Sequence, residues 1–385
     1  MSNIVLDISR ALTRLSEGLH PTGVDRVNRA YVERYHQTAR AIISHRGYTK
    51  LLSRRHSEQA FAILLSDTAA RSSIRTLVAK SLLTPSGGGM EGSVLLHASH
   101  NGMEHVRYHT KMKNCGVRSV FFVHDLIPLT HSEYCRPGVH DTHRRRIHTA
   151  LKYADGLIVN SDDTLRLLAA EADDAGLAMP PSAVARLAPG IEMPHAPAEK
   201  APIAAPYFVM LGTIEPRKNH YLMLHIWRRL VEKLGDAAPK LVIIGRRGWE
   251  CENVIDLLER SAPLGDAVIE ESSCSDSRLR AWLQHARALL FPSFVEGYGM
   301  PLVEALMLGI PVIASDIAVF HEIATNIPDY LDPLDGPGWL SRIQSYAAPN
   351  SPERDAQITR IERFKAPTWA EHFERVDQFL DSLAS

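Results

Sequence analysis

The feature that most limits the folds open to this chain is a regular alternation of short apolar runs with helical patterns, on both sides of one segment rich in proline and alanine. After that segment, five apolar runs are predicted strands: YFVMLGT, KLVIIG, AVIEES, ALLFPS and IPVIAS. Before it, the predicted strands are NIVLDIS, SVLLHAS, SVFFVHD and DGLIVNS, and residues 24 to 41 are a predicted helix. Strands that alternate with helices are typical of doubly wound parallel sheets. The sequence therefore predicts an α/β protein with two such sheets.

The segment between the two blocks reads PGIEMPHAPAEKAPIAAP, and its prolines disfavour regular structure. We expect an N-terminal domain over residues 1–190, a linker over 191–206 and a C-terminal domain over 207–366. In residues 367–385 the apolar side chains recur at helical spacing, which predicts a final helix. With 385 residues, 45% of them hydrophobic and 23% charged, the chain is long enough for two globular domains.

The most informative motif is FPSFVEGYGMPLVEAL, in which a predicted strand ends in a glycine-rich turn that opens a helix. Pro301 suits the first helical turn, and Gly297 and Gly299 leave room for a ligand near the backbone. We expect free amides at the beginning of this helix to receive phosphate or sugar oxygens: those of Met300, Leu302 and Val303. Glu304 lies one turn into the helix, where its carboxylate suits vicinal hydroxyls. Alternatively, Glu296 and Glu304 are solvated residues of an ordinary parallel-sheet segment.

A second motif, YFVMLGTIEPRKNH, leads from an apolar strand into two adjacent cations. Arg217 and Lys218 follow the carboxyl end of the strand, where open α/β sheets bind ligands, and a diphosphate needs such positive charge. Asn219 is a candidate cap for the helix that follows. An Arg-Lys pair in a loop is commonly just solvated, but the two motifs together indicate a site for a sugar nucleotide.

The chain resembles the retaining nucleotide-sugar glycosyltransferases of family 4, which have the GT-B fold. The resemblance rests on LGTIEPRKN, FPSFVEGYGMPLVEAL, VFFVHDLIPL and ADGLIVNSDDTLRLL, and it covers most of the chain apart from residues 40 to 95. It implies two Rossmann-like doubly wound domains facing a cleft, with the C-terminal helix crossing back to pack on the N-terminal domain. The N-terminal domain would bind the acceptor and the C-terminal domain the nucleotide-sugar donor.

The resemblance also implies roles for the motif residues. Arg217 and Lys218 would hold the donor diphosphate, Glu304 would hold the ribose hydroxyls, and Glu296 would hold the hydroxyls of the transferred sugar. Backbone amides of the glycine-rich turn would hold the same sugar: those of Gly297, Tyr298, Gly299 and Met300.

Four further positions receive a role from the resemblance. Gly245 and Arg246, after one strand, and Leu279, at the beginning of a helix, would lie near the nucleobase, without a pattern that separates guanine from uracil. Gly23 would approach the donor phosphate through its backbone, supported by the positive end of the helix over residues 24 to 41. A plain turn is the alternative for Gly23.

His124 and Asp125 end the predicted strand SVFFV at the carboxyl edge of the first sheet. An imidazole at that edge could donate a hydrogen bond to the sugar or stabilise charge near the anomeric carbon, and the resemblance places His124 beneath the reacting centre. A single histidine at a strand end is otherwise commonly structural. Asp125, Asp25 and Arg26 are hypotheses for acceptor binding.

The net charge of −1 hides an asymmetry. Residues 1–150 carry 21 Lys and Arg against 11 Asp and Glu, whereas the rest carry 22 against 33. A basic N-terminal half favours an anionic acceptor or an anionic membrane surface, and Arg144, Arg145 and Arg146 form its densest cationic run. A solvated helix face is the alternative for that run. Nucleic acid is not an expected partner, because no nucleic-acid-binding motif accompanies the charge.

No apolar run approaches the roughly 20 residues of a membrane span, and no signal-peptide pattern occurs. We therefore expect a cytoplasmic protein, with peripheral contact at the inner face of the cytoplasmic membrane as an option. The four cysteines lack C-x-x-C spacing and are expected to be free thiols. His97/His100 and His105/His109 have suggestive spacings, but no cysteine or carboxylate cluster accompanies them, so neither a metal nor a cofactor is expected.

The resemblance thus implies a retaining hexosyltransferase that acts on a glycan or lipid-linked acceptor in bacterial surface polysaccharide biosynthesis, such as lipopolysaccharide assembly, and we expect it to be metal-independent. GDP-mannose is the first choice of donor because VHDLIPL and LGTIEPRKN look most like mannosyltransferases, and a UDP-sugar is the second. A non-catalytic nucleotide-sugar-binding subunit remains an alternative. An epimerase or phosphorylase of the same fold is disfavoured by the pairing of Arg217 and Lys218 with Glu296 and Glu304.

Overall fold

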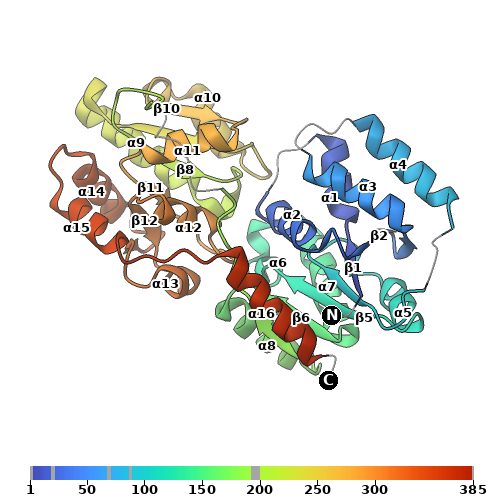
Figure 1. The fold of residues 1–385 in the computed structure, drawn as a ribbon. Coiled ribbons are helices and arrows are strands. Elements are labelled where there is room, and N and C mark those ends of the chain that lie inside the picture. The colour runs from blue at the N-terminus through green and yellow to red at the C-terminus, as the bar shows by residue number, and fades with distance from the viewer. Residues whose placement is uncertain (1–2, 19–21, 67–70, 86–88, 192–199, 384–385) are drawn as a thin grey trace. The chain divides into compact units, whose positions relative to one another are not determined.

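The computed structural model describes residues 3–18, 22–66, 71–85, 89–191 and 200–383. Its tertiary contacts divide the chain into two compact units (Figure 1). Unit 1 comprises Met1–Thr130, Pro137–Leu187 and Thr368–Ser385, and unit 2 comprises His131–Arg136 and Ala188–Pro367. Most of the predicted linker, residues 192–199, lies outside the described residues.

Unit 1 is built on a seven-stranded sheet with the order β3-β2-β1-β4-β5-β6-β7. Its strands are β1 (Ile4–Asp7), β2 (Arg40–His45), β3 (Tyr48–Leu51), β4 (Val94–His97), β5 (Arg118–Val123), β6 (Gly156–Val159) and β7 (Ser182–Val184). All neighbouring strands are parallel except β2 and β3, which form an antiparallel hairpin at one edge. The carboxyl ends of β1, β4 and β5 therefore lie along one edge of the sheet, which is where such sheets bind ligands.

The helices of unit 1 correct two details of the sequence prediction. They are α1 (Ser9–Glu17), α2 (Gly23–Tyr35), α3 (Arg54–Leu65), α4 (Arg71–Leu83), α5 (Val106–Asn114), α6 (Ile127–Thr130), α7 (Val139–Tyr153), α8 (Asp162–Asp174) and α16 (Trp369–Ser382). The helix predicted over residues 24 to 41 ends at Tyr35, because the β-branched Ile42 and Ile43 make Arg40–His45 a strand. A helix, α1, also occupies the stretch between β1 and the predicted helix, where no helix was predicted, and it ends at Gly18 in the left-handed conformation.

The last helix, α16, packs within unit 1. Thr368 and Glu371 cap its first turn reciprocally, which fixes where it begins. Asp377 on this helix accepts a hydrogen bond of 2.7 Å from the hydroxyl of Tyr35 on α2. A Cβ on Gly156 of β6 would lie 2.8 Å from Phe379 Cζ, so only glycine allows the helix to approach this strand so closely.

Unit 2 has a six-stranded, fully parallel sheet with the order β10-β9-β8-β11-β12-β13. Its strands are β8 (Tyr207–Leu211), β9 (Lys240–Ile244), β10 (Val268–Glu271), β11 (Leu289–Phe291), β12 (Val312–Ser315) and β13 (Asp329–Leu331). Its α-helices are α9 (His220–Leu234), α10 (Glu252–Arg260), α11 (Asp276–Gln284), α12 (Met300–Met307), α13 (Ala318–Ala324), α14 (Gly336–Ala347) and α15 (Pro352–Ile361). Four short 3₁₀ helices complete the described elements: η1 (Ser132–Tyr134), η2 (Pro216–Lys218), η3 (Gly235–Ala237) and η4 (Ala262–Leu264).

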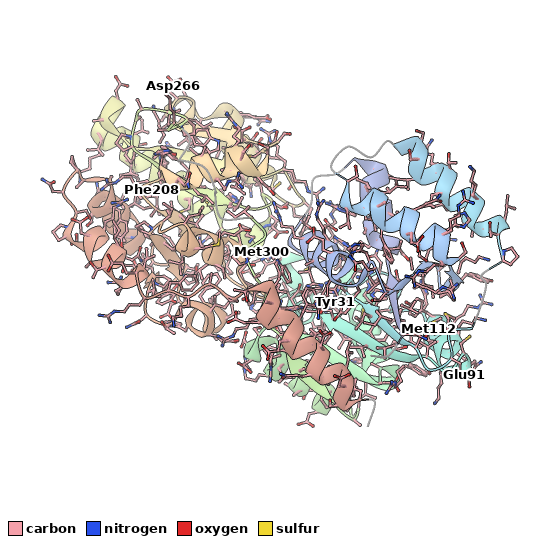
Figure 2. The ribbon with its side chains drawn as sticks, viewed as in Figure 1. Tyr31, Glu91, Met112, Phe208, Asp266 and Met300 are labelled. Carbon is pink, nitrogen blue, oxygen red and sulfur yellow. The ribbon has the colours of Figure 1, made fainter. Side chains whose placement is uncertain are left out.

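Large buried side chains hold each sheet to its helices. In unit 2, Phe208 of β8 and Trp227 of α9 are fully buried, and Trp227 Nε1 donates to the carbonyl of Pro239 at 2.8 Å. In unit 1, Met112 of α5 and Tyr31 of α2 are buried in the same way; Figure 2 labels both, together with Phe208. Each such side chain contributes about 1.5–3 kcal/mol relative to exposure. No helix among the described residues has the length and apolar character that crossing a bilayer requires.

Candidate functional site

Four charged side chains of unit 2 form a closed group beyond the end of β8, which we call the charge cluster: Glu215, Arg217, Lys218 and Glu296. The two terminal nitrogens of Arg217 each lie 2.6 Å from a carboxylate, Nη2 from that of Glu215 and Nη1 from that of Glu296. Lys218 Nζ lies 2.5 Å from Oε1 of Glu296. Because two cations face two carboxylates, the formal charge of the cluster is zero.

Close packing of two loops fixes the backbone that carries these cations. β8 ends at Leu211, and the loop after β9 begins at Gly245. A Cβ on Gly245 would lie 1.9 Å from the carbonyl oxygen of Gly212, so this glycine is required where the loops meet. Asn219 precedes α9 in the left-handed conformation, but its side chain does not cap the helix as predicted. Instead, its amide donates to the carbonyl of Pro333 at 2.8 Å.

Burial raises the pKa of both carboxylates of the cluster and the neighbouring cations lower it, and the net shift has opposite signs in Glu296 and Glu215. Burial alone would raise the pKa of Glu296, but the charges of Arg217 and Lys218 outweigh it and hold that pKa at about 2. For Glu215, burial outweighs the two cations and the pKa is raised. Glu296 is therefore anionic at every physiological pH, whereas Glu215 is the member that takes up a proton more readily.

The beginning of α12 differs from its prediction. The amides of Leu302 and Val303 both donate to the carbonyl of Gly299, at 2.9 and 3.3 Å, so neither is free for a ligand. The carbonyl of the residue before a helix normally accepts the first intrahelical bond, which explains why these two amides are used. Within the described residues, the amides of Gly299 and Met300 have no hydrogen-bond partner. Figure 2 labels Met300 at this point.

Glycine at position 299 is required by its surroundings. Its φ is +114°, and a Cβ there would lie 2.9 Å from the ring of Phe320. Tyr298 is buried, and both it and Gly297 have interactions within the chain.

Glu304 lies one turn into α12 and is buried, with a 4% exposed residue surface. Its Oε1 accepts a hydrogen bond of 3.0 Å from the amide of Gly190, which holds the segment after unit 1 against the helix. A carboxylate only accepts hydrogen bonds, so a carboxylate that a backbone amide fixes in position suits hydroxyl donors.

The positions predicted near a nucleobase divide into two kinds. Gly245 and Arg246 lie on the loop after β9, and the side chain of Arg246 is exposed. Leu279 is buried in α11, and its amide donates to the carbonyl of Ser275 at 2.8 Å. Leu279 therefore offers no free amide to a base, and its place near the nucleobase stays a prediction.

An aromatic group that sequence reasoning missed borders the charge cluster. The segment His131–Arg136, placed in the N-terminal half by the predicted boundaries, packs in unit 2. Tyr134 stacks on Phe294 with ring centres 5.3 Å apart, and Trp249 Nε1 donates to the carbonyl of Tyr134 at 3.1 Å. The amide of Phe294 donates to the carbonyl of Arg217 at 2.8 Å, which connects these rings to the cluster.

In unit 1, His124 follows β5 at the carboxyl edge and is buried. Its Nε2 lies 3.0 Å from the carbonyl of Ala98, and since a carbonyl only accepts, Nε2 carries the proton. Burial lowers the pKa of His124 to about 4, against the opposing effects of the Ala98 carbonyl and Asp125. The ring is therefore neutral at pH 7, and its one N–H is already donated to Ala98. Its remaining nitrogen, Nδ1, is an acceptor.

Two further imidazoles lie near His124: His100, which the sequence offered only as half of a possible metal-ligand pair, and His143, which the sequence did not single out. The ring of His100 lies 5.0 Å from that of His124 and 5.5 Å from that of His143. His143 Nε2 donates to the carbonyl of Asp125 at 3.2 Å, and Asp125 Oδ1 accepts from the amide of Ile127 at 3.1 Å. Burial, followed by the neighbouring imidazoles, lowers the pKa of His100 well below its usual value.

The predicted acceptor residue Asp25 is engaged within unit 1. Its carboxylate pairs with Arg10 at 3.1 Å and Arg14 at 3.0 Å, and it forms a reciprocal cap with Thr22 at the beginning of α2. Burial would raise the pKa of Asp25, but Arg10, Thr22 and Arg14 lower it. This carboxylate therefore joins α1 to α2. Two other predicted positions lie in the first turn of α2: Gly23, which is exposed, and Arg26, which is half-buried.

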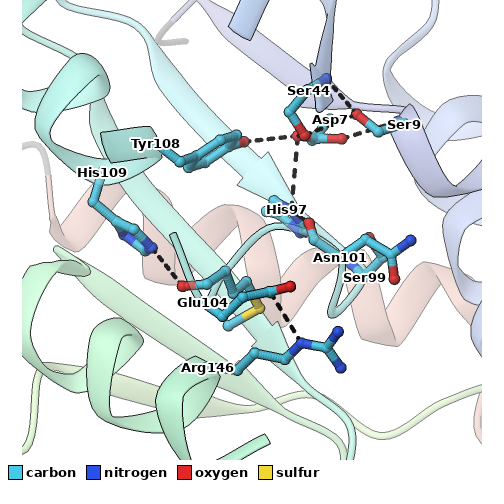
Figure 3. Close-up of polar contacts among 11 residues, drawn as sticks. Asp7, Ser9, Ser44, His97, Ser99, Asn101, Glu104, Tyr108, His109 and Arg146 are labelled. Atoms are coloured by element: carbon cyan, nitrogen blue, oxygen red, sulfur yellow. Dashed lines mark hydrogen bonds and ion pairs between the residues drawn. The ribbon is translucent and has the colours of Figure 1, made fainter. Parts of the chain in front are cut away.

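A buried network holds the carboxyl ends of β1 and β4 in place (Figure 3). Asp7 Oδ2 accepts from the hydroxyls of Tyr108 at 2.8 Å and Ser44 at 3.2 Å, and its Oδ1 accepts from the amide of Ser9 at 2.9 Å. His97 Nε2 lies 3.7 Å from Asp7 Oδ2 and donates to the carbonyl of Asn101 at 2.9 Å. The network fixes the loop that carries His100.

The histidine pairs weighed as metal ligands have structural partners. His97 is part of the network around Asp7, and His109 Nε2 donates to the carbonyl of Met103 at 2.9 Å. Among the described residues, no group of three or more His, Cys, Asp or Glu side chains is arranged to hold a metal ion.

Two parallel α/β sheets with polar groups at their carboxyl edges define the GT-B class of fold. Solved structures of this class superpose on the whole chain. The structure of Anabaena Alr3699/HepE in complex with UDP and glucose has a TM-score of 0.67 and 14% sequence identity, covering 99% of this chain and 100% of that one. Sucrose-phosphate synthase from Thermosynechococcus elongatus has a TM-score of 0.62 and 14% identity, covering 100% and 99%.

Sequence comparison relates part of the chain to a known family. Residues 196–327 match the family described as Glycosyl transferases group 1. The serotype-specific mannosyltransferase WbdA of Escherichia coli is 31% identical over 227 residues, which cover 55% of this chain and 28% of WbdA. The O-antigen chain mannosyltransferase RfbU of Salmonella typhimurium is 33% identical over 142 residues, covering 36% of this chain and 38% of RfbU. Residues 196–327 therefore carry the sequence pattern of the group 1 glycosyltransferases, and the chain spans about a third of the length of these relatives.

Proposed function

We propose that this protein is a retaining glycosyltransferase that transfers a hexose from a nucleoside diphosphate sugar to a glycan or lipid-linked acceptor in bacterial surface polysaccharide biosynthesis. The observation that carries the proposal is the charge cluster beside the free amides of Gly299 and Met300. Mannose from GDP-mannose is the first choice of sugar, because WbdA and RfbU, at 31% and 33% identity, are named mannosyltransferases. A UDP-sugar is the alternative.

In this proposal, the donor diphosphate binds Arg217 and Lys218 by replacing part of their contact with carboxylates. The cluster is neutral without a ligand, so binding a dianion requires either that a carboxylate moves away or that one takes up a proton. Glu215 suits proton uptake because its pKa is already raised by burial. The same cations stabilise the diphosphate when it leaves, which is the largest catalytic contribution we expect from the chain.

Glu296 is proposed to bind hydroxyls of the transferred sugar while it orients Lys218. A carboxylate that two cations and Ser293 already hold, with a pKa of about 2, is a poor base and a poor nucleophile. This favours departure of the leaving group and attack of the acceptor on the same face, without a covalent intermediate on Glu296. The leaving phosphate then receives the proton of the acceptor hydroxyl.

Glu304 and the turn before α12 are proposed to hold the rest of the donor. The buried carboxylate of Glu304 suits the two ribose hydroxyls, and the amides of Gly299 and Met300 suit a sugar or phosphate oxygen. The aromatic pair of Tyr134 and Phe294, with the loop at Gly245, is the proposed neighbour of the nucleobase, since aromatic faces stack on any base.

His124 is proposed to accept a hydrogen bond from a sugar hydroxyl through Nδ1. The carbonyl of Ala98 occupies Nε2, so the ring keeps one tautomer. A neutral imidazole in a fixed orientation discriminates between sugars rather than supplying charge. Gly23, Arg26 and Asp125 stay proposals for phosphate and acceptor contacts.

The test is turnover of sugar nucleotides by the purified protein and by Lys218→Ala and Glu296→Ala. We expect each variant to lose at least about 100-fold in kcat while binding of the bare nucleotide falls chiefly in Lys218→Ala, since that side chain contacts the phosphates. Arg228→Ala, on the exposed face of α9, is the matched control. Near-normal turnover in both site variants would overturn the assignment. Nucleotide binding without any turnover or donor hydrolysis would instead support a non-catalytic subunit.

A further inference from the structure

Three segments of unit 1 carry basic residues and no acidic ones. They are residues 40–51, which contain the β2–β3 hairpin, residues 71–85, which contain α4, and residues 105–114, which contain α5. Together these segments contain nine Lys and Arg and neither Asp nor Glu. They fall largely in the part of the chain that carries little family resemblance, so no role of the proposed function accounts for them.

Contacts join the three segments into one surface. Lys50 Nζ, on β3, donates to the carbonyl of Thr84 beyond α4 at 2.9 Å. The guanidinium of Arg107, on α5, lies 4.0 Å from the ring centre of Tyr48. A Cβ on Gly47, in the hairpin turn, would lie 3.0 Å from the Cβ of His105. The end of α4, the hairpin and the beginning of α5 are therefore neighbours in space.

Apolar side chains are unusually exposed on this surface. Leu83 is 88% exposed, Tyr48 64%, Leu82 58% and Val106 48%. These four are half of the eight large apolar side chains that the described residues leave most exposed. Single exposed leucines are ordinary, but a group of large apolar side chains among cations marks an interaction surface.

The sequence of α4 shows how the leucines come to face outward. Ile74 and Leu77 are buried against the unit, whereas Arg75, Leu82 and Leu83 are exposed. Positions 75, 82 and 83 recur at helical spacing, so a cation and two leucines share the outer side of the helix. The helix α4 therefore packs one apolar side against the core of unit 1 and exposes two leucines at its C-terminal end.

The hairpin turn adds a strained residue at the same place. Arg46 has φ +48° and Gly47 has φ +80°, which is the geometry of a two-residue turn that favours Asn-Gly. An arginine in the left-handed region costs roughly 1 kcal/mol that asparagine or glycine avoids. The side chain of Arg46 is exposed at the tip of the hairpin.

Acidic residues near the surface leave it positive. Glu104, just before α5, pairs with Arg146 at 3.1 Å, and Glu58 on α3 pairs with Arg54 at 3.0 Å. Glu91 lies against Gly116, beyond the other end of α5. Since Arg146 is paired in this way, the arginine run singled out in the sequence is less suited to an anionic partner than the acid-free segments.

We propose that this surface docks the protein on an anionic lipid bilayer. The surface, named here the basic-apolar face, consists of Tyr48, Leu82, Leu83 and Val106 with Arg46, Arg75, Lys80 and Arg107. Leucine and tyrosine side chains enter the interfacial region of a bilayer, while each nearby Lys or Arg gains about 1 kcal/mol from the anionic headgroups. A second copy of the chain is a poor occupant, because two acid-free basic surfaces repel each other.

The experiment is flotation of the purified full chain with vesicles of phosphatidylcholine alone and of phosphatidylcholine with phosphatidylglycerol, at low and physiological salt. Two double variants alter the face: Leu82→Ser with Leu83→Ser, and Arg75→Glu with Lys80→Glu. Two matched controls alter unit 2. Leu334→Ser changes an apolar side chain that is 76% exposed, and Arg363→Glu with Lys365→Glu reverses two exposed charges.

We expect the wild type to bind only the anionic vesicles, and each variant of the face to lower the partition coefficient at least tenfold while the controls stay within twofold. The effect of the charge variant should shrink at higher salt, since exposed charges are screened. Equal binding to both vesicle types, or equal losses in the controls, would overturn the proposal. So would a dimer of the wild type in solution that the leucine variant abolishes, because the face would then be an interface between copies. Nucleotide binding, measured in parallel, should be unchanged in every variant, which separates this test from that of the proposed function.

Discussion

Replacing Glu296 by glutamine should destabilise unit 2, because the negative charge of Glu296 is lost. The size of the destabilisation follows from the pKa of Glu296. The side chain of Glu296 is 8% exposed, and its pKa falls from 4.5 to about 2 in the folded protein. At about 1.4 kcal/mol for each pH unit, this fall corresponds to about 3 kcal/mol of stability at pH 7. We therefore expect Glu296→Gln to lower the free energy of unfolding by about 3 kcal/mol, or the melting temperature by about 6–12 °C for a unit of this size.

The stability that the charge of Glu296 contributes should decrease as the pH falls. Because the folded pKa is depressed, the contribution of Glu296 is fully present above its unfolded pKa near 4.5 and is lost as the pH falls toward 2. The gap between wild type and Glu296→Gln should therefore narrow to about 2 kcal/mol at pH 3.5. A variant that is as stable as the wild type, or a gap that does not change with pH, would refute the electrostatic reasoning.

Urea unfolding followed by tryptophan fluorescence is the assay. Four of the five tryptophans lie in unit 2 and only Trp369 lies in unit 1, so the emission reports mainly on the unit that contains the mutation. Glu259→Gln is the control, because Glu259 pairs with Arg247 on the surface and is 51% exposed. An exposed pair of this kind contributes about 0–1 kcal/mol, so the control should unfold almost like the wild type.

Three further predictions concern other parts of the molecule. Gly245→Ala should abolish nucleotide-induced thermal stabilisation, because the new Cβ would lie 1.9 Å from Gly212 O and would push the loops after β8 and β9 apart. Stabilisation that is retained in the variant would show that nucleotide binding does not depend on the contact between these loops. Unit 1 should lose stability as the pH falls from about 6.5 toward 4. The reason is that His124, His109 and His372 have folded pKa values of about 4 and stay neutral, while the same side chains take up protons in the unfolded chain. A urea midpoint that is unchanged between pH 7 and 5 would contradict this prediction. Turnover should persist in an excess of EDTA, because the positive charges of Arg217 and Lys218 stabilise the diphosphate without a metal. Complete loss of turnover in EDTA, with recovery on adding Mg²⁺, would disprove this role of the two side chains.

The fold class was predicted correctly because its signals are local and repeated. Each buried strand of unit 2 is a short apolar run bounded by turn residues, and the parallel order follows from the helices between the runs. The hairpin of β2 and β3 was missed because RAIISH follows a helical pattern without a proline or glycine to separate them. The antiparallel pairing of β2 and β3 depends on a turn at Arg46 and Gly47, and Arg-Gly is not a sequence that indicates such a turn.

The site was only partly predictable, for a physical reason that differs between residues. Adjacent cations at the end of β8 were evident, but their pairing with Glu215 and Glu296 depends on two loops that meet in space. The free amides were misjudged at Leu302 and Val303, since which carbonyl accepts them depends on the backbone of Gly299. Tyr134 gave no signal at all, because it joins unit 2 from a distant part of the chain.

The central claim is that Arg217 and Lys218 form a metal-independent nucleoside diphosphate site. The most direct test is a calorimetric titration of the wild type and Lys218→Ala with GDP, UDP, ADP and dTDP, each with EDTA present. We predict that the wild type binds one of these nucleotides selectively, and that Lys218→Ala binds it at least about 30-fold more weakly, which is the loss expected when a charge-assisted contact to phosphate is removed. Absence of binding for all four nucleotides, or equal affinity in the variant, would contradict the account.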